Sequence, residues 1–383
     1  MRLALALLFC ACVLCHGQKG GEIQAASYIA IDAASGAVLF EKAADVRRYP
    51  ASTTKIMTAL LLLESCDLDS YVTAPPDFAF VGESSMNLKP GERISVKDLL
   101  YCILLRSAND GCQLAALHVS GSEEAFCAKM TERARSLGAV NTNFVNPHGL
   151  HDDRHYSTAR DLALIAREAM RSPFFRHVVA TRKHRVERSI NGEDLWMVNR
   201  NRLLGPGSIV DGIKTGYTAK AGHCFVGSAE QGGFRVITVV LDSPDWRSDT
   251  LALINRCYAS YERTAVLPSR HISGRALVRG GTAPTVAALT EREAYALLPR
   301  SSPSKPEIKV KLDEVQAPVA LGQKLGELRV VHEGHVVGAV PLVAAEEVGA
   351  SVQASISGWS AWTLLFGVFA VAAWRLLRWN PGG

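Results

Sequence analysis

The sequence predicts an α/β protein in which a largely antiparallel sheet packs against helices, followed by a small all-β domain. Residues 27–42 hold two β-type runs around a Ser-Gly turn, and residues 223–230 and 234–242 form further strand-like runs. Apolar residues at helical spacing occupy much of the interval between these strands. Strands at both ends with helices between them favour a sandwich of sheet and helices.

Each element of this architecture has its own signal. Apolar spacing predicts helices over residues 52–64, 95–106, 122–136 and 157–171, and another near 247–260. A second hairpin is predicted over 184–200, with Asn191-Gly192 at its tip. We therefore assign residues 23–262 to the α/β domain. Short alternating runs separated by Gly and Pro follow, and they predict the all-β domain at 268–345.

Composition is that of a folded globular protein. The chain has 383 residues, 48% hydrophobic and 21% charged, which leaves room for two domains. The net charge of +5 is spread along the chain without a basic run, so we expect no nucleic-acid partner. Of the nine cysteines, six lie beyond residue 17 with no C-x-x-C or zinc spacing. Most of these six are expected to be small core residues.

Both ends of the chain resemble targeting segments. Residues 1–17 combine an early arginine, a run of apolar residues and a small residue, which is typical of a secretory signal peptide. Residues 356–378 are uncharged as far as Trp374 and end in Arg375 and Arg378. This length favours a membrane-spanning anchor with the arginines in the cytoplasm, and a helix lying in the membrane interface stays open as the alternative. The expected location is outside the cytoplasmic membrane, anchored to its outer face.

A lysine stands where a helix start would normally carry an acid. Ser52 is a suitable first residue for the helix at 52–64, and a capping box would place Glu or Gln at position 55. Lys55 stands there instead and opposes the positive end of the helix dipole. A serine and a lysine three residues apart share a helix face, and a lysine with a lowered pKa can deprotonate a serine. Ser52 and Lys55 are therefore a candidate nucleophile and base.

Two further motifs accompany this pair. Among three Ser-x-Asn matches (85–87, 107–109 and 189–191), only Ser107 and Asn109 close a predicted helix that could bring both side chains to a cleft. Lys-Thr-Gly occurs once, at 214–216. A second Ser-x-x-Lys at 302–305 lies among prolines in the β region, and we attribute it to chance. Together these three motifs characterise penicillin-binding proteins and class A β-lactamases.

With these motifs, the chain resembles the D-alanyl-D-alanine carboxypeptidases, the low-molecular-weight penicillin-binding proteins of serine peptidase family S11. Residues 146–170, 212–229 and 317–344 also look like family stretches. The resemblance implies a penicillin-binding (β-lactamase-like) DD-peptidase fold for residues 23–262 and the family's C-terminal β domain after it. The membrane-spanning tail and the six cysteines depart from the usual family pattern.

The resemblance also implies a catalytic mechanism. Ser52 would attack the carbonyl between the two terminal D-alanines of a peptidoglycan stem pentapeptide, with Lys55 as its base. Ser107 would relay a proton to the leaving amine. Asn109 would hold Lys55 and the substrate amide. β-Lactam antibiotics would be covalent inhibitors of the same serine.

Substrate-binding roles follow in the same way. Lys214 and Thr215 would bind the terminal carboxylate, and Lys214 would help to lower the pKa of Lys55. Gly216 would let the substrate backbone lie close to its strand. The backbone N–H of Tyr217 would share the oxyanion hole with that of Ser52. Arg247 is a candidate second partner for the carboxylate.

No metal or cofactor is expected. A loop holds several residues of metal-ligating types, namely His148, His151, Asp152, Asp153 and His155. Spacing within a loop specifies little geometry, and a serine site needs no metal. We interpret the cluster as a polar loop near the cleft.

Two alternative functions stay open. A class A-like β-lactamase would share the acylation site but would need a deacylating Glu, and the stretch "ERSIN" offers Glu187. That residue lies far after Asn109 and in a hairpin arm, which argues against the role. A catalytically silent protein of the penicillin-binding fold is the other alternative, because intact motifs do not prove turnover.

Overall fold

The computed structural model describes residues 22–351 except 80, 81, 83 and 303. They form two compact units, one comprising most of residues 22–257 and the other comprising 31–39, 230–236 and the chain from Tyr258 onward. None of the helices within the described residues is long and apolar enough to cross a bilayer. The predicted signal peptide (1–17) and membrane anchor (356–378) lie outside the described residues.

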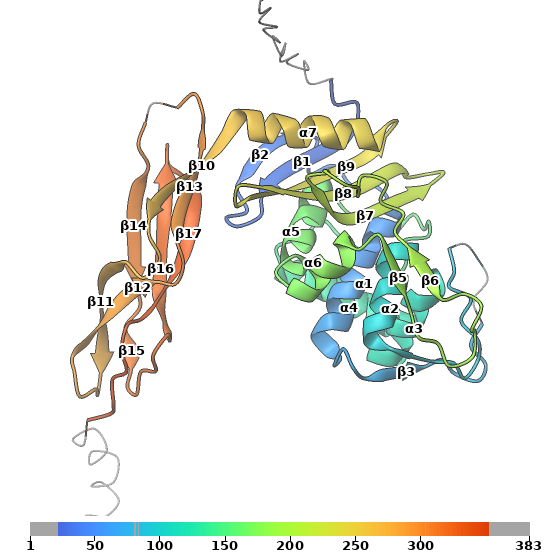
Figure 1. Cartoon of the computed structure of the whole chain (residues 1–383), viewed down its shortest axis with the longest axis horizontal. Helices are drawn as coiled ribbons and strands as arrows, with labels where there is room; N and C mark the ends of the chain where they lie inside the picture. Colours follow the sequence, from blue (N-terminus) through green and yellow to red (C-terminus); the bar gives the residue numbers. More distant parts are fainter. Residues whose placement is uncertain (1–21, 80–81, 83, 303, 352–383) are drawn as a thin grey trace, which may run out of the picture. The chain divides into compact units, whose positions relative to one another are not determined.

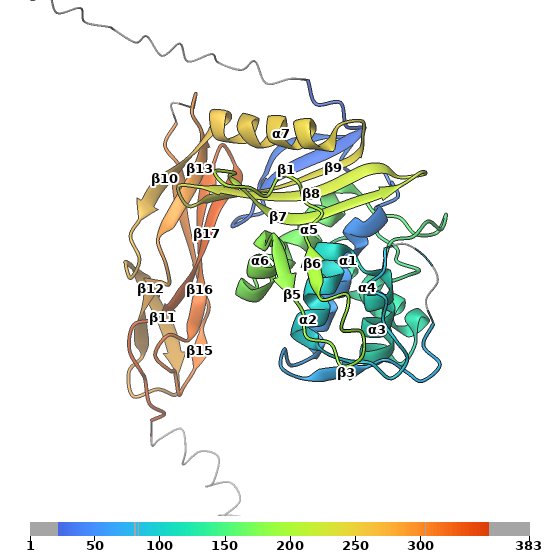
Figure 2. The same cartoon turned by 45° about the vertical axis from the view of Figure 1, so that its right-hand side comes forward.

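A five-stranded sheet organises the first unit. Its order is β2-β1-β9-β8-β7, and β7 pairs antiparallel with β8. The strands are β1 (Ser27–Asp32), β2 (Val38–Lys42), β7 (Val210–Thr218), β8 (Gly222–Gln231) and β9 (Phe234–Ser243). Helix α7 (Trp246–Ser260) covers one face, and the remaining helices gather on the other (Figure 1, Figure 2). The predicted α/β sandwich is therefore confirmed.

Coverage on both faces explains the composition of the central strands. Val226 of β8 and Val239 of β9 are fully buried, and β9 is buried along most of its length. A strand enclosed on both faces is apolar nearly throughout, without strict alternation. This sheet presents its edge strand β7 to the helical layer.

The helical layer contains the predicted helices and two others. Its members are α1 (Lys55–Ser65), α2 (Val96–Tyr101), α3 (Asn109–Ser120), α4 (Glu123–Ser136), α5 (Ala159–Ala169) and α6 (Pro173–Ala180). Sequence reasoning missed α3 and α6. The start of α6 carries a usable signal, because the Ser172 hydroxyl accepts a hydrogen bond from the backbone N–H of Phe175, and Pro173 occupies the first turn.

Two helix boundaries differ from the prediction. The turn that holds Ser52 is a 3-10 helix, η1 (Ala51–Thr54), and α1 begins only at Lys55. No side-chain bond caps η1, so Ser52 is not the capping residue that its type suggested. The helix predicted at 95–106 changes after α2 into a π-helical turn, η2 (Cys102–Arg106), which ends at Ser107. Both departures from α geometry coincide with motif serines, as often occurs at functional sites.

Two short hairpins complete this unit. β5 (Lys183–Arg185) pairs antiparallel with β6 (Trp196–Val198), which confirms the predicted second hairpin, although its strands are short. β3 (Tyr71–Thr73) pairs with β4 (Arg93–Ser95). Arg188 and Glu92 form an ion pair, and both side chains are fully buried. This ion pair joins the β5–β6 connection to the segment before β4.

The second unit is built on a six-stranded sheet of order β14-β16-β17-β12-β11-β15, with β10 and β13 paired separately. Its strands are β10 (Tyr261–Leu267), β11 (Ile272–Arg279), β12 (Thr285–Thr290), β13 (Ala294–Pro299), β14 (Glu307–Leu312), β15 (Val315–Gln316), β16 (Lys324–His332) and β17 (His335–Ala344). Val286, Leu328 and Val340 are among its buried core residues. The all-β region expected after the α/β domain is thus present.

All six cysteines beyond residue 17 are free thiols. Cys102, Cys112, Cys127, Cys224 and Cys257 are buried, and Cys66 is half-buried. Burial raises the pKa of the Cys112 thiol to about 12, so this thiol stays protonated and unreactive. The expectation that most of the cysteines are small core residues is confirmed.

Candidate active site

The junction of η1 and α1 places Ser52 beside Lys55. Lys55 is fully buried, whereas Ser52 is partly exposed at the cleft. The Lys55 ammonium Nζ donates a hydrogen bond to Ser52 Oγ over 3.0 Å. The sequence motif therefore becomes a direct contact between a potential nucleophile and a potential base.

Two further acceptors hold the Lys55 side chain. Its Nζ lies 2.7 Å from Asn109 Oδ1 and 2.6 Å from the backbone oxygen of His148. Burial lowers the pKa of Lys55 to about 8, and the Arg200 charge acts in the same direction. The resemblance to the family implies a contribution from Lys214 to this lowering. Burial is the larger cause, because it removes the water that would stabilise the ammonium.

The Ser-x-Asn motif spans the end of one helix and the start of the next. Ser107 follows η2 with a left-handed φ of 69°, and Asn109 is the first residue of α3. Both are nearly buried and both line the cleft. The backbone N–H of Asn109 donates to the Ser84 carbonyl over 2.7 Å. Asn109 thus contacts Lys55 from the start of α3, and Ser107 lines the same cleft from the end of η2.

Strand β7 forms the opposite wall. Lys214 is buried, and its Nζ donates to the Thr215 carbonyl over 3.0 Å. Burial and the charge of Lys55 hold the pKa of Lys214 well below its usual range. Thr215 and Tyr217 line the cleft, and the Tyr217 side chain is 61% exposed. The charge of Lys55 therefore acts on Lys214, and the expected effect of Lys214 on Lys55 stays a prediction.

The structure explains why residue 216 is a glycine, for a reason that the sequence did not reveal. A Cβ at this position would lie 3.0 Å from the backbone nitrogen of Ser52 and 3.1 Å from the Ala51 Cβ. A side chain would push β7 away from η1. Glycine therefore fixes the distance between the strand and the nucleophile.

The loop after α4 supplies groups that the residue types did not reveal. A Cβ on Gly149 would lie 1.9 Å from the Ala51 carbonyl oxygen, and the φ of Gly149 is +88°. Only glycine fits there, because the space and the backbone conformation both exclude a side chain. Asn146 Oδ1 accepts the Gly149 N–H over 2.7 Å. This turn delivers the His148 carbonyl to Lys55.

Both ring nitrogens of His155 in this loop have structural partners. The Thr54 hydroxyl donates to the Ala51 carbonyl and accepts from His155 Nε2 over 2.8 Å, because His155 Nδ1 accepts the Val145 N–H. Burial lowers the pKa of His155 to about 4, which keeps the ring neutral. Within the described residues, no group of three or more His, Cys, Asp or Glu side chains is arranged to hold a metal ion.

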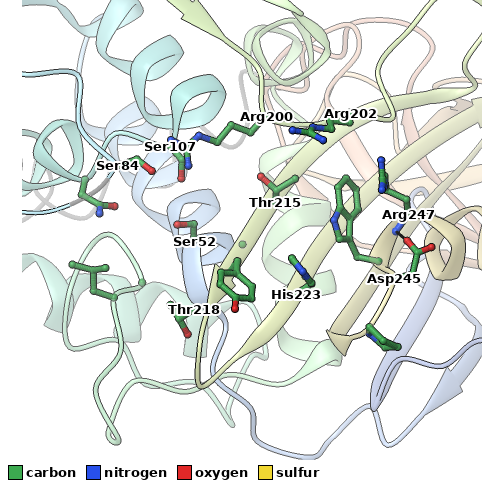
Figure 3. Close-up of a pocket in the computed structure, with 17 residues that line it drawn as sticks. Ser52, Ser84, Ser107, Arg200, Arg202, Thr215, Thr218, His223, Asp245 and Arg247 are labelled. Atoms are coloured by element: carbon green, nitrogen blue, oxygen red, sulfur yellow. Dashed lines mark hydrogen bonds between the residues drawn. The ribbon is translucent and has the colours of Figure 1, made fainter.

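These walls enclose a cleft of about 800 Å³ (Figure 3). The predicted site residues that line it are Ser52, Ser107, Asn109, Thr215, Gly216, Tyr217 and Arg247. Lys55 and Lys214 are buried next to it. Sequence reasoning missed Arg200, Arg202, His223 and Trp246, which also line the cleft. These residues carry no motif, so only their position in the fold identifies them.

The candidate deacylating residue of a β-lactamase lies elsewhere. Glu187 is exposed, and its backbone N–H donates to Asp98 Oδ2 over 3.0 Å. It is not among the described residues that line the cleft. The structure therefore agrees with the sequence argument against this role.

Comparison with known proteins decides the family. Residues 15–245 match the family model described as D-alanyl-D-alanine carboxypeptidase, and residues 261–350 match that of the penicillin-binding protein 5 C-terminal domain. The chain belongs to the D-alanyl-D-alanine carboxypeptidase family of serine peptidases. The predicted family is thus confirmed.

Carboxypeptidases of this family match most of the chain. This chain is 34% identical over 345 residues to the D-alanyl-D-alanine carboxypeptidase DacF of Bacillus subtilis. The match covers 86% of this chain and 88% of the relative. DacA of Escherichia coli is also 34% identical, covering 85% of this chain and 84% of the relative. Penicillin-binding protein 5 of Haemophilus influenzae has a solved structure with a TM-score of 0.65 and 29% identity, covering 86% of this chain and 98% of that one.

Proposed function

We propose that this protein is a serine-type D-Ala-D-Ala carboxypeptidase that removes the terminal D-alanine from peptidoglycan stem pentapeptides. The observation that carries the proposal is the contact between Ser52 Oγ and a fully buried lysine whose pKa is lowered to about 8. A lysine with this pKa is neutral in a fraction of the molecules near neutral pH and can then activate a serine. Membership of the carboxypeptidase family supports the same activity.

Acylation transfers one proton and exchanges one bond. Neutral Lys55 takes the hydroxyl proton of Ser52, and the Ser52 oxygen bonds to the carbonyl carbon of the penultimate D-alanine. The amide bond to the last residue then breaks. Ser107, which lines the cleft together with Ser52, relays the proton to the leaving amine.

Two backbone donors and one polar wall complete the site. The N–H groups of Ser52 and Tyr217 are proposed to hold the developing oxyanion, at about 3 kcal/mol for each donor. Thr215 and the neighbouring Lys214 are proposed to bind the terminal carboxylate, with Arg247 as a further partner. Water then attacks the ester carbonyl and gives a proton to Lys55, which returns it to Ser52 as the ester bond breaks.

A direct test compares a peptide with a penicillin. A pentapeptide ending in D-Ala-D-Ala should release D-alanine at many turnovers, and labelled penicillin should stay attached to Ser52 for minutes or longer. The tethered leaving group of penicillin stays in the site and obstructs water, whereas free D-alanine diffuses away. Glu187→Gln should leave the penicilloyl lifetime unchanged. Rapid penicillin hydrolysis that Glu187→Gln abolishes would establish the β-lactamase alternative instead.

We also propose that the protein is exported and anchored to the outer face of the cytoplasmic membrane. The proposal is supported by the sequence of the signal-like segment 1–17 and the apolar segment 356–378. A chain ending at Ser355 should be released from the membrane and keep its activity. Protease added to intact cells should cut the main body and spare Arg375 onward. A full-length protein found in the soluble fraction would contradict the anchor.

A further inference from the structure

One side of the cleft is strongly cationic. Arg200, Arg202 and Arg247 all line it, and Figure 3 draws them on the Thr215 side of Ser52, with Thr218 on the other side. Asp245 is the one acidic side chain among the described residues of the lining. Three guanidinium groups and one carboxylate therefore line this side of the cleft.

The acidic residue is already engaged. Asp245 Oδ2 accepts the Ser248 hydroxyl over 2.7 Å, and its Oδ1 accepts the backbone N–H groups of Arg247 and Ser248. Asp245 thus caps the start of α7, and these bonds lower its pKa. The Asp245 carboxylate is thus engaged at the start of α7, two residues before Arg247. Asp245 therefore does not neutralise Arg202, whose charge is available to a ligand.

Arg202 sits on a turn whose backbone is held on both sides. Asn199 Oδ1 accepts the Asn201 N–H over 2.9 Å, and Asn201 Oδ1 accepts the Leu203 N–H over 3.0 Å. The Asn199 amide in turn donates to the carbonyls of Val179 and Thr181. Asn201 is buried, whereas Arg202 is exposed. The turn therefore presents the guanidinium from a fixed backbone position.

Among the residues that the structure describes, no carboxylate pairs with the Arg202 guanidinium. Across the part of the chain that the structure describes, Arg202 makes no ion pair, whereas many of the other arginines do. An exposed arginine facing a cleft can bind a carboxylate through two parallel N–H donors. Its location in the cleft makes a substrate the natural source of that carboxylate.

The same turn borders the leaving-group side of the reaction. The Arg200 backbone N–H donates to the Leu105 carbonyl over 3.2 Å, at the end of the helix that leads into Ser107. In the proposed mechanism Ser107 gives a proton to the leaving amine, and Thr215 binds the terminal carboxylate. A group that reaches Arg202 therefore belongs to the residue that leaves.

We propose that Arg202 is a specificity-determining residue that binds a second carboxylate, carried on the side chain of the leaving D-amino acid. This inference rests on the proposed carboxypeptidase function. The bond broken is unchanged: the amide between the penultimate D-alanine carbonyl and the amine of the last residue. The protein accordingly favours an acidic leaving residue over a neutral one of the same size.

The test uses three pentapeptides that are identical through the fourth residue and end in D-Ala, D-Glu or D-Gln. D-Glu and D-Gln have the same shape, so the ratio of their kcat/KM values reports the charge alone. The wild-type ratio should be about twofold to fivefold, within the range expected for an exposed ion pair. High salt should move it towards one, because exposed charges are screened.

Two variants test whether Arg202 causes the preference for D-Glu over D-Gln. In Arg202→Gln the D-Glu to D-Gln ratio should fall to about one, and a general loss of activity cancels in that ratio. Arg182→Gln is the matched control, because Arg182 is exposed and does not line the cleft. It should keep the wild-type ratio.

The outcomes separate this inference from the proposed function. A wild-type ratio of one, or a ratio that Arg202→Gln leaves unchanged, overturns the inference while D-alanine release still stands. An equal loss in Arg182→Gln also overturns it, because the effect would then be general electrostatics. If no peptide releases its last residue, the proposed function fails and the inference fails with it.

Discussion

The chain contains two Ser-x-x-Lys stretches with the same spacing and different environments. At 52–55 the lysine begins a helix, is fully buried and donates a hydrogen bond to the serine. At 302–305 the residues precede strand β14, Lys305 is exposed, and the Ser302 hydroxyl lies 3.0 Å from His332 Nε2. Among the described residues of the two stretches, only Ser52 and Lys55 form a hydrogen bond between the serine and the lysine.

This difference shows which structural conditions a Ser-x-x-Lys sequence needs in order to form a reactive site. A helical turn is required for residues three apart to face each other. Burial is required to lower the pKa of a lysine into a range where it acts as a base. The described residues Ser302, Ser304 and Lys305 are not helical, and Lys305 is exposed, so neither condition is met there. Four predictions test this comparison, from the largest expected effect to the smallest.

Replacing each serine gives the largest contrast. Ser52→Ala should abolish acylation by labelled penicillin, a loss on the order of 10⁴-fold or more, because the reacting oxygen is removed. The Ser302→Ala variant should be acylated by penicillin at the wild-type rate. Peptide mapping of the labelled protein checks both variants. Label recovered on Ser302 would mean that the second stretch is reactive.

Replacing each lysine by arginine separates charge from base function. Lys55→Arg should lower the acylation rate by roughly 10²-fold to 10⁴-fold, because arginine keeps its proton and cannot accept one. Lys305→Arg should have no effect on acylation. Stopped-flow acylation with a chromogenic cephalosporin measures both rates. Near-normal acylation in Lys55→Arg would remove Lys55 from the mechanism.

The close contact between Gly149 and the Ala51 carbonyl should be needed for the Ser52–Lys55 site and should have no counterpart at 302–305. Gly149→Ala forces a Cβ into the Ala51 carbonyl at a left-handed φ, so we expect a loss of about 2–4 kcal/mol in the free energy of unfolding. Gly192→Ala is the control, because a Cβ there meets nothing within 4 Å. Urea denaturation compares the two. Equal stabilities would show that the loop can shift without cost.

The pH dependence should follow the lowered pKa of Lys55. Only neutral Lys55 accepts the Ser52 proton, so acylation should fall tenfold for each pH unit below about 8 and level off above it. Acylation rates between pH 5.5 and 9.5 give the profile. A rate that keeps rising towards pH 10 would indicate a lysine with an ordinary pKa.

Sequence reasoning named several residues of the candidate site because they belong to motifs. Ser52, Lys55, Asn109 and Thr215 were named from their patterns, and the structure brings them together. The carbonyl of His148 was not predicted, because a backbone oxygen carries no residue-type signal. The helix α3 was missed as well.

The cationic side of the cleft also lay beyond the sequence. Arg200 and Arg202 belong to no motif, and their turn reaches the cleft only through contacts with distant segments such as Leu105. An exposed arginine in sequence is indistinguishable from a solvated surface charge. The fold alone gives these two a position beside the reacting serine.

Local patterns by themselves determined the fold class, most of the helices, the three motifs and the family, because helical and strand periodicity and motif spacing act over a few residues. The tertiary structure decided which Ser-x-x-Lys is a site and why its lysine can be a base. Lys55 meets Asn109 and the His148 carbonyl across 54 and 93 residues of chain. Burial and such distant contacts set its pKa, and no local pattern encodes them.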